Sequence, residues 1–172
     1  MHRAIVLALA LALGGCASLD KAECVNADWY AIGLEDGARG RPLERLGEHR
    51  RACAGHGVTP NTQRYLAGRG EGLKSFCTFQ RGYSNGRAGQ AFADVCPAGL
   101  AGAFAAGYRQ GRELYDLQRQ LSSVQAEIRK SKQALKEGIA DPRSRAREVE
   151  RLEALSREAE NLERELSRLQ SN

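Results

Sequence analysis

Hydrophobic residues follow three different patterns along the chain, and each pattern predicts a different kind of element. Residues 4–13 form an unbroken apolar run behind a short basic start. A helix of that length covers only ~15 Å, about half the hydrocarbon core of a bilayer, so the run predicts a signal peptide rather than a membrane span. Residues 26–111 mix apolar residues with glycines in short helical stretches. From Leu114 onward, apolar residues recur at heptad spacing among charged residues.

The heptad pattern predicts a long antiparallel helical hairpin, a coiled coil, over residues 112–172. The pattern is interrupted between its two halves, where Gly138 suits a helix end, Asp141 an N-cap and Pro142 a first helical position. A short linker between two helices makes them antiparallel neighbours. The a and d positions are Leu114, Leu117, Leu121, Val124, Ile128, Ser131, Leu135 and Gly138 in the first helix, and Leu152, Leu155, Ala159, Leu162, Leu166 and Leu169 in the second.

Sixteen of the nineteen glycines lie in residues 33–111, and many share one spacing. An aromatic residue is followed by glycine three positions later and by another glycine four positions after that. Glycines at i and i+4 leave one helix face bare, which predicts close helix–helix packing. The segments carry charged residues between the glycines, and no strand–loop–Gly-Lys-Ser/Thr pattern indicates a phosphate-binding loop. The predicted packing glycines are Gly33, Gly37, Gly68, Gly72, Gly107 and Gly111, after Tyr30, Tyr65 and Phe104, and Tyr83-x2-Gly86-x2-Gly89 is a shorter version.

Four cysteines beyond Cys16 predict two disulfides. Helices are expected over 26–40, 43–54 and 62–77 and after Cys96-Pro97. If the first two form an antiparallel hairpin, Cys24 lies beside Cys53, and the same arrangement of the other two joins Cys77 to Cys96.

A zinc site is the competing interpretation, since His49-x3-Cys53-x2-His56 has a ligand-like spacing. A bridged Cys53 has no thiolate, so no metal site is expected, and His49 and His56 are interpreted as solvated or capping residues.

The end of the apolar run, Leu13-Gly14-Gly15-Cys16, resembles a bacterial lipobox. The resemblance implies a signal peptide over 1–15, cleavage before Cys16, acylation of that cysteine (palmitate among the acyl chains), and a lipidated tether over 16–23. Ala17 favours the outer membrane, on its periplasmic side, with the inner membrane as the alternative. An ordinary secreted protein is the competing interpretation.

Charge and candidate catalytic residues exclude some functions. The formal net charge is +5, but basic and acidic residues are interleaved, so no nucleic-acid partner is expected. Acid–base chemistry would need carboxylates and a histidine in one cleft. Glu35 and Asp36 are adjacent on a helix and point in different directions, and Asp28 fits a helix start. The protein is therefore predicted not to be an enzyme and to need no cofactor. The candidate groups are Asp28, Glu35, Asp36, His49 and Glu71.

A set of spaced residues over roughly residues 20–115 resembles one family. The set is Cys24-x3-Asp28-Trp29-x3-Gly33-x2-Asp36-Gly37, His49-x3-Cys53, Tyr65-x2-Gly68-x3-Gly72-x4-Cys77, Gly82-Tyr83-x2-Gly86 and Cys96-Pro97. It is similar to an uncharacterised family of Gram-negative lipoproteins, domain of unknown function 2799. The resemblance implies location and a helical fold, and it implies no activity.

These patterns together predict an all-α protein with a small disulfide-linked, glycine-rich domain over 24–111, followed by the hairpin. The expected function is that of an envelope lipoprotein that acts as a binding or scaffold module facing the periplasm. Its partners are the membrane, through the lipid on Cys16, and a protein partner or a second copy, through 112–172. The alternative is a periplasmic enzyme that uses the acidic residues and histidine of the glycine-rich domain.

Overall fold

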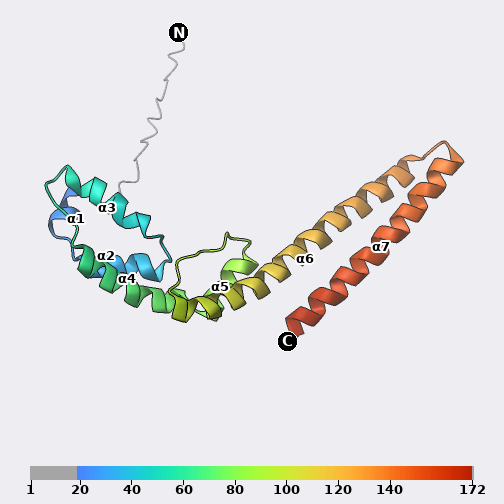
Figure 1. The fold of residues 1–172 in the computed structure, drawn as a ribbon. Coiled ribbons are helices and arrows are strands. Elements are labelled where there is room, and N and C mark those ends of the chain that lie inside the picture. Colours follow the sequence, from blue (N-terminus) through green and yellow to red (C-terminus); the bar gives the residue numbers. More distant parts are fainter. Residues whose placement is uncertain (1–18, 172) are drawn as a thin grey trace, which may run out of the picture. The chain divides into compact units, whose positions relative to one another are not determined.

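The computed structural model describes residues 19–171, so Cys16 and the predicted signal peptide lie outside the described residues. Every regular element in 19–171 is an α-helix, which confirms the all-α prediction (Figure 1). The chain divides into two compact units between Leu73 and Lys74, here called unit 1 and unit 2. The helices are α1 (Lys21–Val25), α2 (Trp29–Ala38), α3 (Glu44–Ala54), α4 (Thr62–Phe76), α5 (Phe79–Arg87), α6 (Ala98–Glu137) and α7 (Pro142–Ser171).

In unit 1, α2 and α4 pack backbone to backbone through their glycines. A Cβ atom added to Gly33 would lie 2.1 Å from the carbonyl oxygen of Tyr65. One added to Gly37, four residues later, would lie 2.3 Å from the carbonyl oxygen of Arg69, also four residues later. Because the contacts advance in the same direction on both helices, the pair is parallel. The four glycines of this interface are Gly33, Gly37, Gly68 and Gly72.

In unit 2, α5 and α6 repeat the same interface. A Cβ on Gly82 would lie 2.1 Å from the carbonyl oxygen of Phe104, and one on Gly86 would lie 2.2 Å from that of Tyr108. This pair is therefore also parallel, and its approach is too close for any side chain at the contact. Such proximity brings Cα–H groups against carbonyl oxygens, a weak attraction that recurs at close helix contacts. The glycines are Gly82, Gly86, Gly107 and Gly111.

The repeat corrects one detail of the sequence interpretation. The register of α5, a helix that the sequence did not predict, is Phe79-x2-Gly82-x3-Gly86 and not the one starting at Tyr83. Gly89 lies after α5 with a φ of +68°, as Gly40 lies after α2 with a φ of +66°. The backbone N–H of each of these two glycines donates a 2.9 Å hydrogen bond to the carbonyl oxygen three residues earlier. Each glycine therefore ends its helix in the left-handed conformation. Units 1 and 2 therefore share the same paired-helix arrangement.

Both disulfides join the pairs favoured by the sequence, Cys24–Cys53 and Cys77–Cys96, with Cα–Cα distances of 5.4 and 5.6 Å. The first bridge holds the end of α3 to α1, and His49 of α3 reaches Asp36 of α2. The second predicted hairpin, of 62–77 with the helix after Cys96, is wrong, because α5 intervenes and pairs with α6. Each bridge joins the segments that precede the two helices of a pair. Parallel helices start at the same end, so the cysteines before them meet there.

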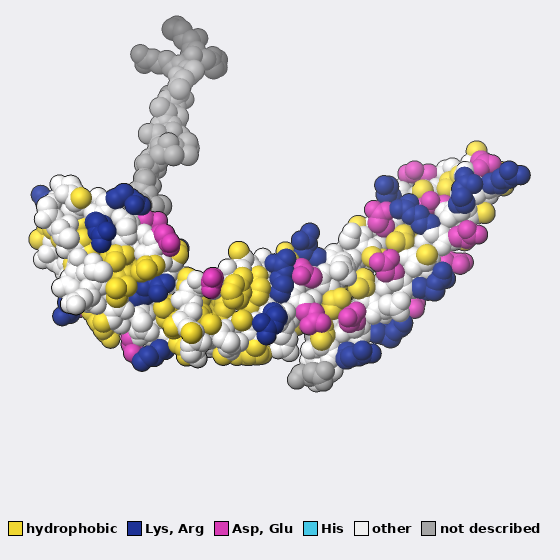
Figure 2. All heavy atoms as spheres, viewed as in Figure 1, with side chains coloured by type: hydrophobic (Ala, Val, Ile, Leu, Met, Phe, Trp, Pro, Cys, Tyr) yellow, Lys and Arg dark blue, Asp and Glu magenta, His cyan; other side chains and the backbone are white. Residues whose placement is uncertain are grey.

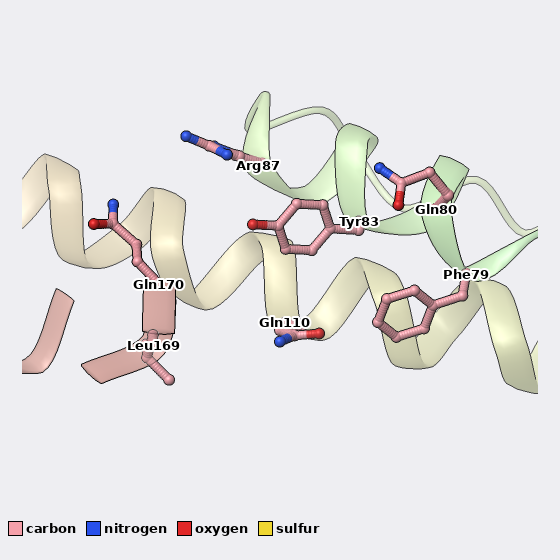
Figure 3. A pocket seen from close by; sticks show the side chains of 7 residues that line it. All are labelled: Phe79, Gln80, Tyr83, Arg87, Gln110, Leu169 and Gln170. Carbon is pink, nitrogen blue, oxygen red and sulfur yellow. The ribbon is translucent and has the colours of Figure 1, made fainter. Parts of the chain in front are cut away.

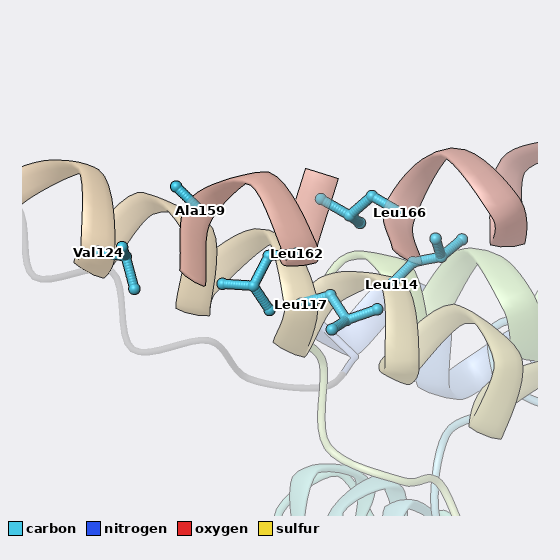
Figure 4. Packing of buried hydrophobic residues seen from close by; sticks show 6 residues of the cluster. All are labelled: Leu114, Leu117, Val124, Ala159, Leu162 and Leu166. Atoms are coloured by element: carbon cyan, nitrogen blue, oxygen red, sulfur yellow. The ribbon is translucent and has the colours of Figure 1, made fainter. Parts of the chain in front are cut away.

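The predicted hairpin forms within unit 2. Gly138, with a φ of +92°, ends α6, and the Asp141 side chain caps α7 by accepting from the Ser144 amide at 2.8 Å. Glu127 of α6 forms an ion pair with Arg151 of α7, and Ser131, four residues later on α6, donates a hydrogen bond to Glu148, three residues earlier on α7. The two helices are therefore antiparallel. The buried cluster between them consists of Leu114, Leu117, Val124, Ala159, Leu162 and Leu166 (Figure 4).

Helix α6 belongs both to the glycine-packed pair and to the hairpin. Its 40 residues run without interruption from Ala98 to Glu137, about 60 Å at 1.5 Å per residue. The composition of the sequence changes near residue 112, but the helix does not break there. The hairpin is therefore a rigid continuation of the α5–α6 pair.

Candidate functional site

Three polar side chains meet inside unit 1, one from each of α2, α3 and α4. The Asp36 carboxylate lies 2.7 Å from Nε2 of His49 and accepts a 2.8 Å hydrogen bond from the hydroxyl of Tyr65, both on Oδ2. An ionised carboxylate only accepts, so Nε2 of His49 carries the proton of its bond. Asp36, His49 and Tyr65 are 7%, 3% and 0% exposed. These three residues form a buried polar cluster.

Local structure places each member of the cluster. Asp36 precedes the packing glycine Gly37 and projects to the α3 side of α2. Tyr65 begins the glycine motif of α4, and its ring meets the His49 ring edge-on at 5.9 Å. Trp29 meets the same imidazole from α2 at 6.4 Å. His49 is thus enclosed between two aromatic rings, and its Nδ1 has no hydrogen-bond partner among the described residues.

The cluster shifts two pKa values in opposite directions. Burial by itself raises the pKa of the Asp36 carboxyl, but the hydrogen bonds from His49 and Tyr65 outweigh burial and hold this pKa below its usual value. Burial raises the pKa of the Tyr65 phenol strongly, and the hydrogen bond to the charged Asp36 adds to the increase. The arrangement therefore keeps Asp36 ionised and Tyr65 protonated over a wide pH range.

We expect Tyr65 to resist alkaline titration. Its raised pKa stabilises the fold fully below the unfolded value near pH ~10, and this contribution is lost as pH rises through the folded value. Near-ultraviolet absorbance should show the Tyr65 phenol ionising only as the protein unfolds at alkaline pH. Tyr65→Phe should lack this ionisation step, and a wild-type protein whose absorbance change at unfolding equals that of Tyr65→Phe would contradict the buried cluster.

The other candidate residues lie apart from this cluster. Asp28 caps α2, accepting from the amides of Tyr30 and Ala31 at 3.0 and 3.3 Å, as its expected role at a helix start requires. Glu35 is exposed and pairs with Arg39 at 2.6 Å. Glu71 lies exposed on α4.

The residues of the zinc interpretation are also separated. Cys53 is held in its disulfide and His56 is exposed. His49 is buried, so its interpretation as a solvated or capping histidine is wrong. The cause is tertiary, because α3 turns His49 toward a carboxylate on another helix. Among residues 19–171 no group of three or more potential ligands could hold a metal ion.

The chemistry open to the cluster follows from its burial. A carboxylate that accepts a ring N–H from an imidazole leaves the other ring nitrogen free to act as a base. Here the imidazole faces Trp29 and Tyr65 instead of a cleft. The cluster ties three helices together through charge-assisted hydrogen bonds. Asp36 and His49 are separate candidates in the sequence, and Tyr65 was interpreted only as part of the glycine motif, so its pairing with Asp36 was not predicted.

The fold and this cluster define a class of protein, a small all-α domain with two glycine-packed helix pairs. In each pair, one disulfide joins the segments that precede the two helices. A family model described as "Protein of unknown function (DUF2799)" matches residues 28–113, and the chain belongs to this family. The matched range begins at the cap of α2 and ends in α6, so it contains both glycine interfaces. Comparison with curated proteins and with solved structures gives no match. None of the helices in residues 19–171 has the length and apolar character to cross a bilayer.

Proposed function

We propose that the protein is a lipid-anchored envelope lipoprotein that acts as a binding or scaffold module facing the periplasm, with its hairpin as the partner-binding arm. The observation that carries the proposal is the continuity of α6. One uninterrupted helix is fixed at its start by a disulfide and a glycine interface and then forms half of the hairpin. The hairpin is thus a rigid extension of the α5–α6 pair. A rigid extension of this kind suits the binding of a partner better than it suits catalysis.

The surface of the arm fits a docking role. Acidic and basic side chains are interleaved along the hairpin (Figure 2). The leucine seam is already covered inside the hairpin, so a partner would meet the polar outer faces of α6 and α7. Mixed charges favour specific pairing over indiscriminate attraction to a polyanion. The partner is a protein of complementary charge pattern, or a second copy of this chain.

A photo-reactive amino acid placed on the arm in intact cells tests this role. Arg143 and Arg157 lie exposed on α7, and Arg50 lies exposed on α3 of unit 1 as a matched control. The expected result is one adduct of the same identity from both arm positions and not from Arg50, with mass spectrometry distinguishing a second copy from another protein. Adducts from Arg50 alone, or none from the arm, would refute the arm as the docking surface.

The lipid anchor has its own test. Replacing Cys16 with serine removes the thiol that the lipobox resemblance assigns to acylation, so labelling with a fatty-acid probe should be lost and the larger precursor should accumulate. Cys96→Ser is the control that removes a cysteine without touching the lipobox. Unchanged labelling and size of Cys16→Ser would rule out the lipoprotein assignment. Fractionation of outer from inner membrane then tests the proposed outer-membrane location.

A periplasmic enzyme is the alternative function, and one observation favours it. Asp36 and His49, two of the candidate groups, are in hydrogen-bond contact. Catalysis would require unit 1 to open at α3 and admit a substrate to His49.

A further inference from the structure

Unit 2 contains an open pocket of about 370 Å³ at which α5, α6 and α7 meet (Figure 3). Its size falls in the range of small-molecule sites, roughly 300–1,000 Å³. Neither the buried polar cluster nor the disulfides contribute to it. The lining residues are Phe79, Gln80, Tyr83, Arg87, Gln110, Leu169 and Gln170.

Two aromatic rings line this pocket. The rings of Phe79 and Tyr83 lie nearly parallel, at 12°, with centroids 6.5 Å apart, on successive turns of α5. Phe79 is 45% exposed, although large apolar side chains are usually covered in a fold with this many helices. Figure 3 shows the two rings side by side, with Gln110 beside them and Leu169 and Gln170 beyond the Tyr83 ring. Phe79 is exposed and Tyr83 is half-buried against the hairpin cluster, so together the two rings give the pocket an aromatic platform that is partly open to solvent.

The groups around the platform are neutral amides and one cation. Gln80, Gln110 and Gln170 each offer one carbonyl acceptor and two N–H donors. Among the described residues that line the pocket, Arg87 is the single charged one and none carries a carboxylate. A platform of this kind accepts the C–H face of a sugar ring, amides pair with hydroxyl and acetamido groups, and a guanidinium pairs with a carboxylate.

Unit 1 provides an internal comparison, because the glycine registers align α5 with α2 and α6 with α4. The position of Phe79 corresponds to Tyr30, which is also exposed, at 38%. The positions of Gln80 and Gln110 correspond to Ala31 and Glu71. Thus the exposed aromatic belongs to the shared architecture, while the amides and the cation around it are particular to unit 2.

We propose that this pocket binds an acidic glycan of N-acetylated amino sugars, with the sugar ring on Phe79 and Tyr83, the acetamido group on the glutamines, and a carboxylate on Arg87. The proposal rests on the envelope location proposed above, which places such polymers within reach. A docked helix of another protein is the competing occupant. It fits less well, because an apolar helix face would leave three amides without partners.

Calorimetric titration of the full chain as recovered from cells, in detergent, tests the assignment with two probes. One is N-acetylglucosaminyl-N-acetylmuramic acid, which carries a carboxylate, and the other is the neutral N,N′-diacetylchitobiose. The acidic disaccharide should bind about tenfold more tightly than the neutral one, and Arg87→Gln should abolish that difference, as one charge-assisted hydrogen bond is worth roughly this factor. Phe79→Ala should weaken both at least tenfold, and Gln110→Ala provides a second variant if Phe79→Ala does not fold.

Tyr30→Ala is the matched control, since it removes the equivalent exposed ring from unit 1, and it should leave both affinities unchanged. Absence of binding by either disaccharide overturns the proposal, as does an equal loss in Phe79→Ala and Tyr30→Ala. A protein adduct formed from a photo-reactive residue at position 79 in cells, without disaccharide binding, would assign the pocket to a partner helix instead. Lipid labelling of Cys16 that succeeds while both sugars fail would refute the pocket alone and leave the envelope role standing.

Discussion

Gly68→Ala should destabilise the protein by about 3 kcal/mol or more and lower its melting temperature by roughly 10 °C. The added Cβ would lie 2.0 Å from the carbonyl oxygen and 2.8 Å from the carbonyl carbon of Tyr30, and 2.9 Å from the amide nitrogen of Leu34. All three are backbone atoms, so no side chain can rotate away, and α2 and α4 must separate. Thermal unfolding followed by circular dichroism measures the effect.

Gly70→Ala is the matched control on the same helix. A Cβ there would meet nothing within 4 Å, so alanine should increase stability by about 0.5–1 kcal/mol through its better helix propensity. Gly82→Ala should repeat the loss in unit 2, where the new Cβ would lie 2.1 Å from the Phe104 carbonyl oxygen. Equal melting temperatures for Gly68→Ala and Gly70→Ala would contradict the glycine-packed interface.

Asp36→Ala should cost about 3 kcal/mol. The change leaves the Tyr65 hydroxyl and Nε2 of His49 buried without their acceptor, and each unsatisfied group costs roughly 1–3 kcal/mol. In the wild type, the lowered pKa of Asp36 means that its contribution is present above the unfolded value near pH ~4 and is lost as pH falls through the folded value. Chemical denaturation at neutral and acidic pH measures both effects.

Two further variants provide comparisons for the stability loss of Asp36→Ala. Asn85 holds the position of Asp36 in the unit 2 repeat and is half-buried outside the cluster, so Asn85→Ala should cost less than about 1 kcal/mol. Tyr65→Phe removes only one hydroxyl and should cost about 1–1.5 kcal/mol. If Asp36→Ala and Asn85→Ala are equally stable, the cluster does not hold the three helices together.

The hairpin could be predicted from the sequence because its signals are local. The heptad spacing of the leucines can be recognised in each helix separately. Gly138, Asp141 and Pro142 indicate the turn between the helices independently of the rest of the fold. Six of the eight packing glycines, all but Gly82 and Gly86 of α5, were predicted for the same reason, since their i, i+4 spacing describes one face of one helix.

The partners and direction of the glycine helices were not predictable from spacing alone. The glycine spacing on one helix is the same whether the neighbouring helix is parallel or antiparallel. The position of Gly33 in the sequence therefore does not indicate that it packs against Tyr65. Helix α5 was missed because its nine residues include two glycines, which weaken helix propensity, and because Tyr83 offers a second aromatic start to the same pattern. The buried polar cluster depends on contacts 13 and 29 residues apart, which only the folded chain creates.

The parallel pairing of α2 with α4 and of α5 with α6 is the central structural claim, and nuclear Overhauser contacts of the unmodified protein test it directly. For parallel helices we expect contacts from the Hα atoms of Gly33 and Gly37 to the amides of Arg69 and Leu73 respectively, because a Cβ on either glycine would lie 3.0 Å from that nitrogen. In unit 2 the same holds for Gly82 and the amide of Tyr108. Contacts in the reverse order, with Gly33 near Leu73 and Gly37 near Tyr65, would mean that the helices are antiparallel and would rule out the parallel pairs.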